Sequence, residues 1–229
     1  MKFLMIKKKT IVSFIICIVL LLGILITYFS VTQTSSPKTN YTIVIDAGHG
    51  GIDGGAVGKK TGITESELNL KYAKKLQNLC TEYGFKVIMT REDMNGLYSE
   101  DAPNKKKSEM EKRKRIINES GADVMISLHM NSFPLPNCEG AQIFYAKGSQ
   151  QGFNLAKSVQ KSICQTFKSA RDYVTVGDYF VLNYSSIPAI LIECGFLSNP
   201  NEEISLQKDE YCEKFCQNVM VGILSYFQK

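Results

Sequence analysis

The stretch "VIDAGHGGIDGG", residues 44–55, decides how the rest of the chain is to be interpreted. An apolar run typical of a buried strand ends here in Asp46, and a glycine-rich loop follows that contains His49. Glycine tolerates positive φ and lets the backbone approach a ligand closely, so such a loop is typical of a binding site. Its glycine spacing matches neither the phosphate-binding nor the dinucleotide-binding motif. His49, one of two histidines in the chain, is therefore the feature that needs a function.

Outward from this stretch, apolar segments with strand and helix periodicity alternate. Strands rich in Val, Ile and Phe are predicted at 42–46, 86–90, 123–128, 141–145, 178–182 and 188–192. Apolar residues at helical spacing predict helices around 68–83, 155–167 and 211–227. The alternation predicts a single three-layer α/β domain, with helices on both faces of a mostly parallel, twisted sheet. A chain of 229 residues with 44% hydrophobic composition is long enough for one such core.

The N-terminal part of the chain has a different character. Residues 11–29 carry no charge and are long enough to cross a bilayer as a helix, and lysines precede them. We expect residues 1–30 to form a signal anchor, with a cleaved signal peptide as the alternative. Residues 31–40 are expected to form a polar linker, and residues 41–229 a catalytic domain outside the cytoplasm.

Charge and cysteine content limit the function further. The net charge of +5 comes mainly from the N-terminal lysines and a basic cluster within 105–115, which argues against a nucleic-acid partner. We expect the polar stretch 94–111 to leave the domain surface beside the site and to end in a basic helix. The six cysteines after the apolar run show no C-x-x-C pair, and several fall on apolar faces, which favours free core thiols over disulfides.

Polar residues follow three of the predicted strands at the edge where open α/β sheets bind ligands. His49 follows 42–46, His129 follows 123–128, and Glu193 closes 188–192. Two imidazoles and a carboxylate are a recurring set of ligands for catalytic zinc. Glu65 and Glu67 both begin the helix after the glycine loop, and position alone leaves them as equal candidates for the third ligand.

Glu193 ends the apolar segment "PAILIE", where a carboxylate loses part of its hydration. Desolvation raises the pKa of a carboxylic acid towards the range useful for a general base, so Glu193 is a candidate to accept a proton from a metal-activated water. A serine or cysteine hydrolase is disfavoured, because no G-x-S-x-G motif is present and Cys194 points to the opposite side of its strand.

Five motifs occur in order between Tyr41 and Lys229: "IVIDAGHGGIDGGAVG", "TESELNL", "VIMTRE", "GADVMISLHMNS" and "AILIECGFLSNPNEE". With these motifs the sequence resembles the zinc-dependent N-acetylmuramoyl-L-alanine amidases of the Amidase_3 family. The resemblance implies one Zn²⁺ ion held by His49, Glu65 and His129, with Glu193 as the catalytic glutamate, and it favours Glu65 over Glu67. It also implies a substrate contact for Arg113. The implied reaction is hydrolysis of the amide between N-acetylmuramic acid and L-alanine of the peptidoglycan stem peptide.

Within this family, a short chain with an N-terminal apolar run resembles the germination-specific, CwlD-like amidases of spore-formers. That resemblance implies a role in making cortex muramic-δ-lactam, on the outer face of the forespore membrane. It also implies peptidoglycan as substrate and leaves room for a stabilising or activating protein partner. The alternatives are a vegetative cell-wall or division amidase, another zinc amidohydrolase, and a partner-dependent wall-binding module with little activity alone.

Overall fold

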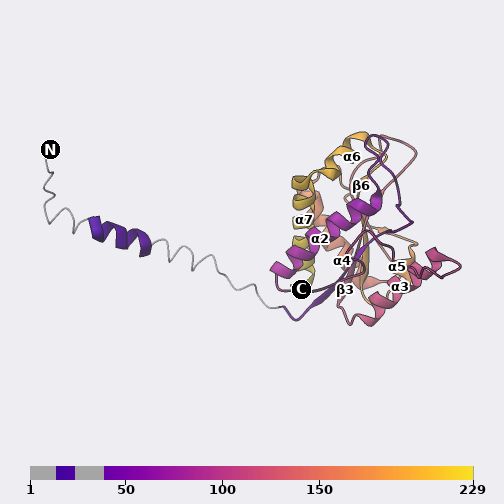
Figure 1. Ribbon diagram of the computed structural model, residues 1–229, viewed down its shortest axis with the longest axis horizontal. Coiled ribbons are helices and arrows are strands. Elements are labelled where there is room, and N and C mark those ends of the chain that lie inside the picture. Colours follow the sequence, from indigo (N-terminus) through magenta and orange to yellow (C-terminus); the bar gives the residue numbers. More distant parts are fainter. Residues whose placement is uncertain (1–13, 24–38, 229) are drawn as a thin grey trace. The chain divides into compact units, whose positions relative to one another are not determined.

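The computed structural model describes residues 14–23 and 39–228, which belong to two units of the chain that we treat separately (Figure 1). In the first unit, residues 14–23 form a helix with exposed apolar side chains, among them Phe14 and Leu21. Among the described residues, no helix is both long and apolar enough to cross a membrane. Most of the predicted anchor (1–30) and linker (31–40) lies outside the described residues, so both stay predictions.

The second unit is built on a six-stranded sheet within residues 39–228, in the order β2-β1-β3-β6-β4-β5. All neighbouring strands run parallel except β4 and β6, so the sheet is mixed but mostly parallel, as predicted. The strands are β1 (Thr42–Ala47), β2 (Lys86–Met89), β3 (Val124–Asn131), β4 (Gln142–Tyr145), β5 (Thr175–Val176) and β6 (Ala189–Phe196).

Helices cover both faces of this sheet (Figure 1). One face carries α2 (Glu65–Glu82), α4 (Gln150–Thr166) and α7 (Asp209–Phe227), and the other carries α3 (Lys105–Glu119) and the short α5 (Phe180–Asn183). Strand alternation separates the two cores: Ile43 and Ile45 face α2, whereas Val44 between them faces α3. The three-layer α/β architecture expected from the sequence is thereby confirmed. The remaining helix, α6 (Pro200–Gln207), follows β6.

The strand predicted at 178–182 is wrong, because the chain forms α5 there. A short apolar run such as "YFVL" does not distinguish a strand from a helical turn by its periodicity. Val181 and Leu182 are neighbours in sequence, yet both are buried against the α3 side of the sheet, which one turn of helix permits and an extended strand does not. The edge strand β5 lies earlier, at Thr175–Val176. Neither β5 nor α6 was predicted.

The central strands bring the polar residues of the sequence motifs to one edge. In the parallel register Asp46 lies beside Ser127, and His129 lies beside Glu193. Both β3 and β6 continue past the predicted ends, so His129 and Glu193 belong to the strands themselves rather than to the loops after them. No described cysteine forms a disulfide, and Cys194 packs with the α2 side of the core, opposite Glu193.

Candidate metal centre and active site

His49 lies in the loop that follows β1 and has an unusual backbone conformation. Its φ is 60°, and it is the one non-glycine residue with positive φ among those described. Histidine is one of the residue types that tolerate this region better than most. Its Nδ1 lies 3.0 Å from Oδ1 of Asp53, four residues further along the same loop. This distance is that of an ion pair, and Nδ1 has no hydrogen-bond partner within the described residues, so Asp53 acts on the ring through its charge.

Glu65 is the first residue of α2, and backbone N–H groups hold its carboxylate in place. Oε2 accepts a hydrogen bond from the N–H of Ala56 at 2.9 Å, and Oε1 accepts one from the N–H of Met130 at 3.2 Å. The helix begins here because Thr64 caps it and Glu67 completes a capping box with the backbone N–H of Thr64. Glu67 is therefore engaged at the exposed helix end, whereas Glu65 points to the sheet edge.

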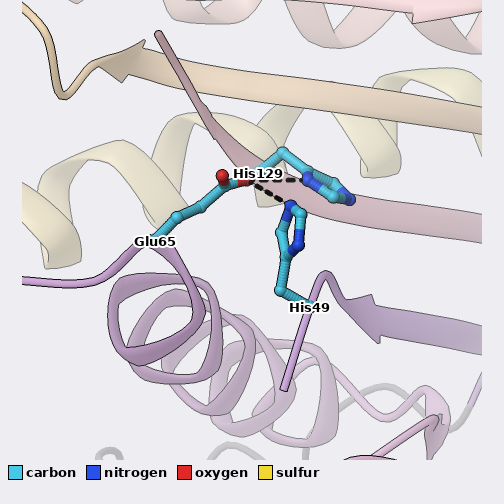
Figure 2. Close-up of side chains that lie close together, drawn as sticks. All are labelled: His49, Glu65 and His129. Atoms are coloured by element: carbon cyan, nitrogen blue, oxygen red, sulfur yellow. Dashed lines mark hydrogen bonds and ion pairs between the residues drawn. The ribbon is translucent and has the colours of Figure 1, made fainter. Parts of the chain in front are cut away.

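His49, Glu65 and His129 converge from three separate elements, as Figure 2 shows. Glu65 Oε1 lies 3.1 Å from Nε2 of His49 and 2.8 Å from Nδ1 of His129. One potential ligand atom from each residue lies within 4.8 Å of the other two, a spacing that permits a shared metal ion. Burial alone would raise the pKa of Glu65, but the hydrogen bonds to His129 and His49 outweigh it and hold that pKa below its usual range.

Two glycines of the loop leave space for the other two members of this group. A Cβ on Gly48 would lie 2.2 Å from Nε2 and Cε1 of the His129 ring. At Gly55, which also has a positive φ of 68°, a Cβ would lie 2.5 Å from Oε2 of Glu65. The glycine-rich sequence around His49 is thus explained by close approach: the loop must pass directly over the His129 ring and the Glu65 carboxylate.

Glu193 faces the same cavity, which has a volume of about 580 Å³. The residue is 7% exposed, and its Oε2 has no hydrogen-bond partner in the described part of the chain. Burial raises the pKa of Glu193 to about 7, although the nearby histidines act in the opposite direction. An unpaired buried carboxylate is costly, and such perturbed groups concentrate at functional sites. The carboxyl group can therefore exchange protons near neutral pH.

Arg113, on α3, lines this cavity but is only 2% exposed. Its terminal nitrogens donate to Asp46, Glu109 and two backbone carbonyls. The predicted substrate contact of Arg113 is not tested by these interactions and stays a prediction. What the structure adds is a set of internal partners that sequence analysis did not anticipate.

Sequence analysis also missed two acidic residues of the "NPNEE" motif that fix loops around the site. Glu203, 1% exposed, accepts hydrogen bonds from the N–H groups of Lys60 and Thr61. Glu202 accepts from the N–H groups of Phe196 and Gly140. The signal available in the sequence was weak, since two acids at the start of a helix are ordinarily explained by the helix dipole.

A His–Glu–His group at a sheet edge with a buried carboxylate beside it is typical of metal-dependent hydrolases. Residues 43–225 match the family model for N-acetylmuramoyl-L-alanine amidase, Amidase_3, and the chain belongs to this family. The germination-specific N-acetylmuramoyl-L-alanine amidase of Bacillus subtilis is 33% identical in an alignment of 229 positions that covers 96% of this chain and 96% of that protein.

Two solved structures have the same fold. The CwlD amidase from Clostridioides difficile, in complex with the GerS lipoprotein, matches with a TM-score of 0.79 and 37% identity over 82% of this chain and 99% of that one. An N-acetylmuramoyl-L-alanine amidase from Clostridium difficile 630 matches with a TM-score of 0.74 and 33% identity over 82% of this chain and 97% of that one. The resemblance to CwlD-like amidases drawn from the sequence is confirmed.

Proposed function

We propose that this chain is a zinc-dependent peptidoglycan amidase that cleaves the bond between N-acetylmuramic acid and L-alanine of the stem peptide. The observation that carries the proposal is the convergence of His49, Glu65 and His129 in one cavity with the unpaired carboxylate of Glu193. Membership of the amidase family indicates which bond is cleaved.

The residues present fit a zinc ion. His49 and His129 would each give an imidazole nitrogen and Glu65 a carboxylate oxygen, which is one of the donor sets that catalytic zinc uses. The short distances from Glu65 Oε1 to both rings bring three donor atoms together. When bound, zinc polarises a substrate carbonyl and lowers the pKa of a water molecule.

Glu193 is proposed to move the proton in this reaction. Its carboxylate accepts a proton from the attacking water and then delivers that proton to the amide nitrogen, so that the C–N bond breaks and L-alanine leaves as an amine. Burial raises the pKa of Glu193 and favours uptake of the proton, whereas a nearby cation lowers that pKa and favours its release. The open cavity beside it leaves room for the muramic acid residue.

We further propose that the substrate is spore cortex peptidoglycan and that the product serves muramic-δ-lactam formation. The support is the match to the germination-specific amidase of Bacillus subtilis along 96% of both proteins, which includes part of the N-terminal apolar run. The test is to express this chain in a spore-former that lacks its own germination-specific amidase. Cortex muropeptides containing the lactam should reappear with the wild-type chain but not with Glu193→Gln.

Localisation follows from the same relationship. We propose that residues 1–30 act as a signal anchor or signal peptide and place the domain 41–229 on the extracytoplasmic side, at the outer face of the forespore membrane. We also propose a lipoprotein partner, because the CwlD structure is a complex with the GerS lipoprotein. Such a partner would stabilise the zinc-bound form, since three protein ligands hold zinc less firmly than four.

The reaction itself is tested with the full-length chain in detergent and purified peptidoglycan. Released peptides are followed by mass spectrometry, with zinc present or removed by chelation. We expect stem peptides with a free L-alanine amine from the wild type only when zinc is present. Glu193→Gln should bind zinc normally and be slower by about 10²- to 10⁴-fold. Cleavage at another bond of peptidoglycan, or full activity without zinc, would contradict the proposal.

A further inference from the structure

Two buried arginines donate hydrogen bonds to the backbone of the loop that carries His49. Arg91, after β2, is 4% exposed, and Arg113, on α3, is 2% exposed. Together they donate hydrogen bonds to the carbonyl oxygens of three consecutive residues, Ala47, Gly48 and His49. Every carbonyl of this three-residue segment is thus bound by a charged side chain.

Arg91 uses its guanidinium to join the loop to helix α2. Its Nε donates to the Ala47 carbonyl at 2.9 Å, and its Nη2 donates to the carbonyls of Gly48 at 3.0 Å and Ser66 at 2.8 Å. Ser66 directly follows Glu65, so one planar side chain binds the backbone on both sides of the metal-ligand group. Hydrogen bonds from a charged donor are stronger than neutral ones, and the rigid fork of arginine fixes their geometry.

Arg113 binds both ends of the same segment and is itself bound by two carboxylates. Its Nη1 donates to the Ala47 carbonyl at 2.8 Å and to Asp46 Oδ1 at 2.5 Å. Its Nη2 donates to the His49 carbonyl and to Glu109 Oε1, the latter at 2.6 Å. Asp46 and Glu109 thus orient the guanidinium towards the backbone of His49 itself.

The two arginines differ in how well their charges are compensated. Although burial acts against it, Asp46 and Glu109 raise the pKa of Arg113 above its usual value. Burial, and then the nearby charge of Arg113, lower the pKa of Arg91 to about 10. Two like charges in a buried region repel each other, and arginine needs partners for its N–H groups when it is removed from water. The segment that they bind contains His49, the one described non-glycine residue with positive φ. Such a backbone conformation persists only where surrounding contacts hold it in place.

We propose that Arg91 and Arg113 are positioning residues that fix the backbone of His49, so that its imidazole is already directed at Glu65 and His129 before metal binds. The inference rests on the proposed zinc site. It assigns Arg113 a role in metal affinity that does not require contact with substrate. Because the hydrogen bonds act on the ligand's backbone, their loss should weaken zinc binding in a protein that is still folded.

The test uses Arg91→Lys and Arg113→Lys, which keep the positive charge but lose most of the hydrogen bonds. Arg115→Lys is the matched control, since Arg115 is exposed on the same helix. Zinc affinity of the full-length chain in detergent is measured by competition with a chromophoric chelator. Visible absorption of the cobalt-substituted protein reports ligand geometry, and urea unfolding of the metal-free protein reports stability.

We expect each of the two variants to bind zinc about 10- to 100-fold more weakly, as is typical when groups that orient a metal ligand are removed. The cobalt spectrum should change in both, and Arg115→Lys should match the wild type in every measurement. Folded Arg91→Lys and Arg113→Lys proteins with wild-type zinc affinity would overturn the inference, even if urea unfolding showed them to be less stable.

Two further outcomes are separated by the design. If the lysine variants do not fold, the inference is tested with Glu109→Gln, which weakens the support of Arg113 without removing any contact to the loop. Weaker zinc binding by this variant supports the inference, and unchanged binding overturns it. If the wild-type chain itself binds no zinc, the proposed metal site fails, and the inference fails with it. That result is read from the wild type alone and cannot be confused with an effect of the variants.

Discussion

Replacing Glu193 with glutamine should abolish proton transfer and, at the same time, stabilise the metal-free protein. The carboxyl group is 7% exposed, and Oε2 has no hydrogen-bond partner among the described residues. Ionising it in the folded state is therefore unfavourable, and its pKa rises from 4.5 to about 7. Glutamine has almost the same shape but carries no charge, so the cost of burying the carboxylate disappears.

The sign and size of this effect follow from proton linkage. The folded protein holds the Glu193 proton more tightly than the unfolded chain, so this contribution to stability is fully present below the unfolded pKa of 4.5 and is lost as pH rises through about 7. A shift of this size corresponds to about 3 kcal/mol at alkaline pH. The advantage of Glu193→Gln should therefore grow from about 1 kcal/mol at pH 5 to about 3 kcal/mol at pH 8.

The assay is urea unfolding of the full-length chain at pH 5, 6, 7 and 8 in the presence of a zinc chelator. Glu119→Gln, at the exposed end of α3, is the control and should change stability little at any pH. Added zinc should reduce the advantage of Glu193→Gln, because a nearby cation favours the ionised carboxylate and lowers its pKa. A variant that is no more stable than wild type at pH 8, or whose advantage does not depend on pH, would refute the reasoning.

Two further predictions concern the ligands of the site. Glu65→Gln should abolish stoichiometric zinc binding in a zinc titration. Glu67→Gln should bind zinc normally and, in urea unfolding, lose only about 0.5–1 kcal/mol of unfolding free energy through the weakened helix cap. Gly48→Ala should lose zinc binding and activity because a Cβ there would lie 2.2 Å from the His129 ring. Gly54→Ala in the same loop should keep both, since its nearest neighbouring atom would be 3.6 Å away; equal zinc binding by the two alanine variants would contradict the steric explanation.

The parts of the fold that the sequence predicts well are those with a local cause. Strands β1, β3 and β6 are buried on both faces and are therefore mainly apolar until their polar site residues, and the long helices show a clear apolar stripe. The segment around Phe180 has no such pattern, because an apolar run of four residues fits either one turn of helix or a strand. Its helical form depends on packing against α3, which is remote in sequence, as well as against β6.

The choice between Glu65 and Glu67 shows how a local rule could have added to the prediction. Thr64-x-x-Glu67 has the spacing of a capping box, in which the acid at the third helical position binds back to the cap residue. That rule assigns Glu67 to the helix end and leaves Glu65 as the candidate for the proposed metal site. By contrast, no local rule shows that Gly48 must leave space for a histidine 81 positions away, since that contact exists only after β1 and β3 have paired.

The site combines several features that each lower the stability of the fold. Glu193 is buried without a partner, His49 has a positive φ, and two arginines lie close together behind it. Such features persist only where the surrounding structure over-determines them. Here the strands that carry Glu193 and His129 are central and fully paired, so the sheet itself supplies the rigidity. If that account holds, substitutions that relieve a single unfavourable feature will stabilise the chain and impair its chemistry together, which is the combination expected of Glu193→Gln.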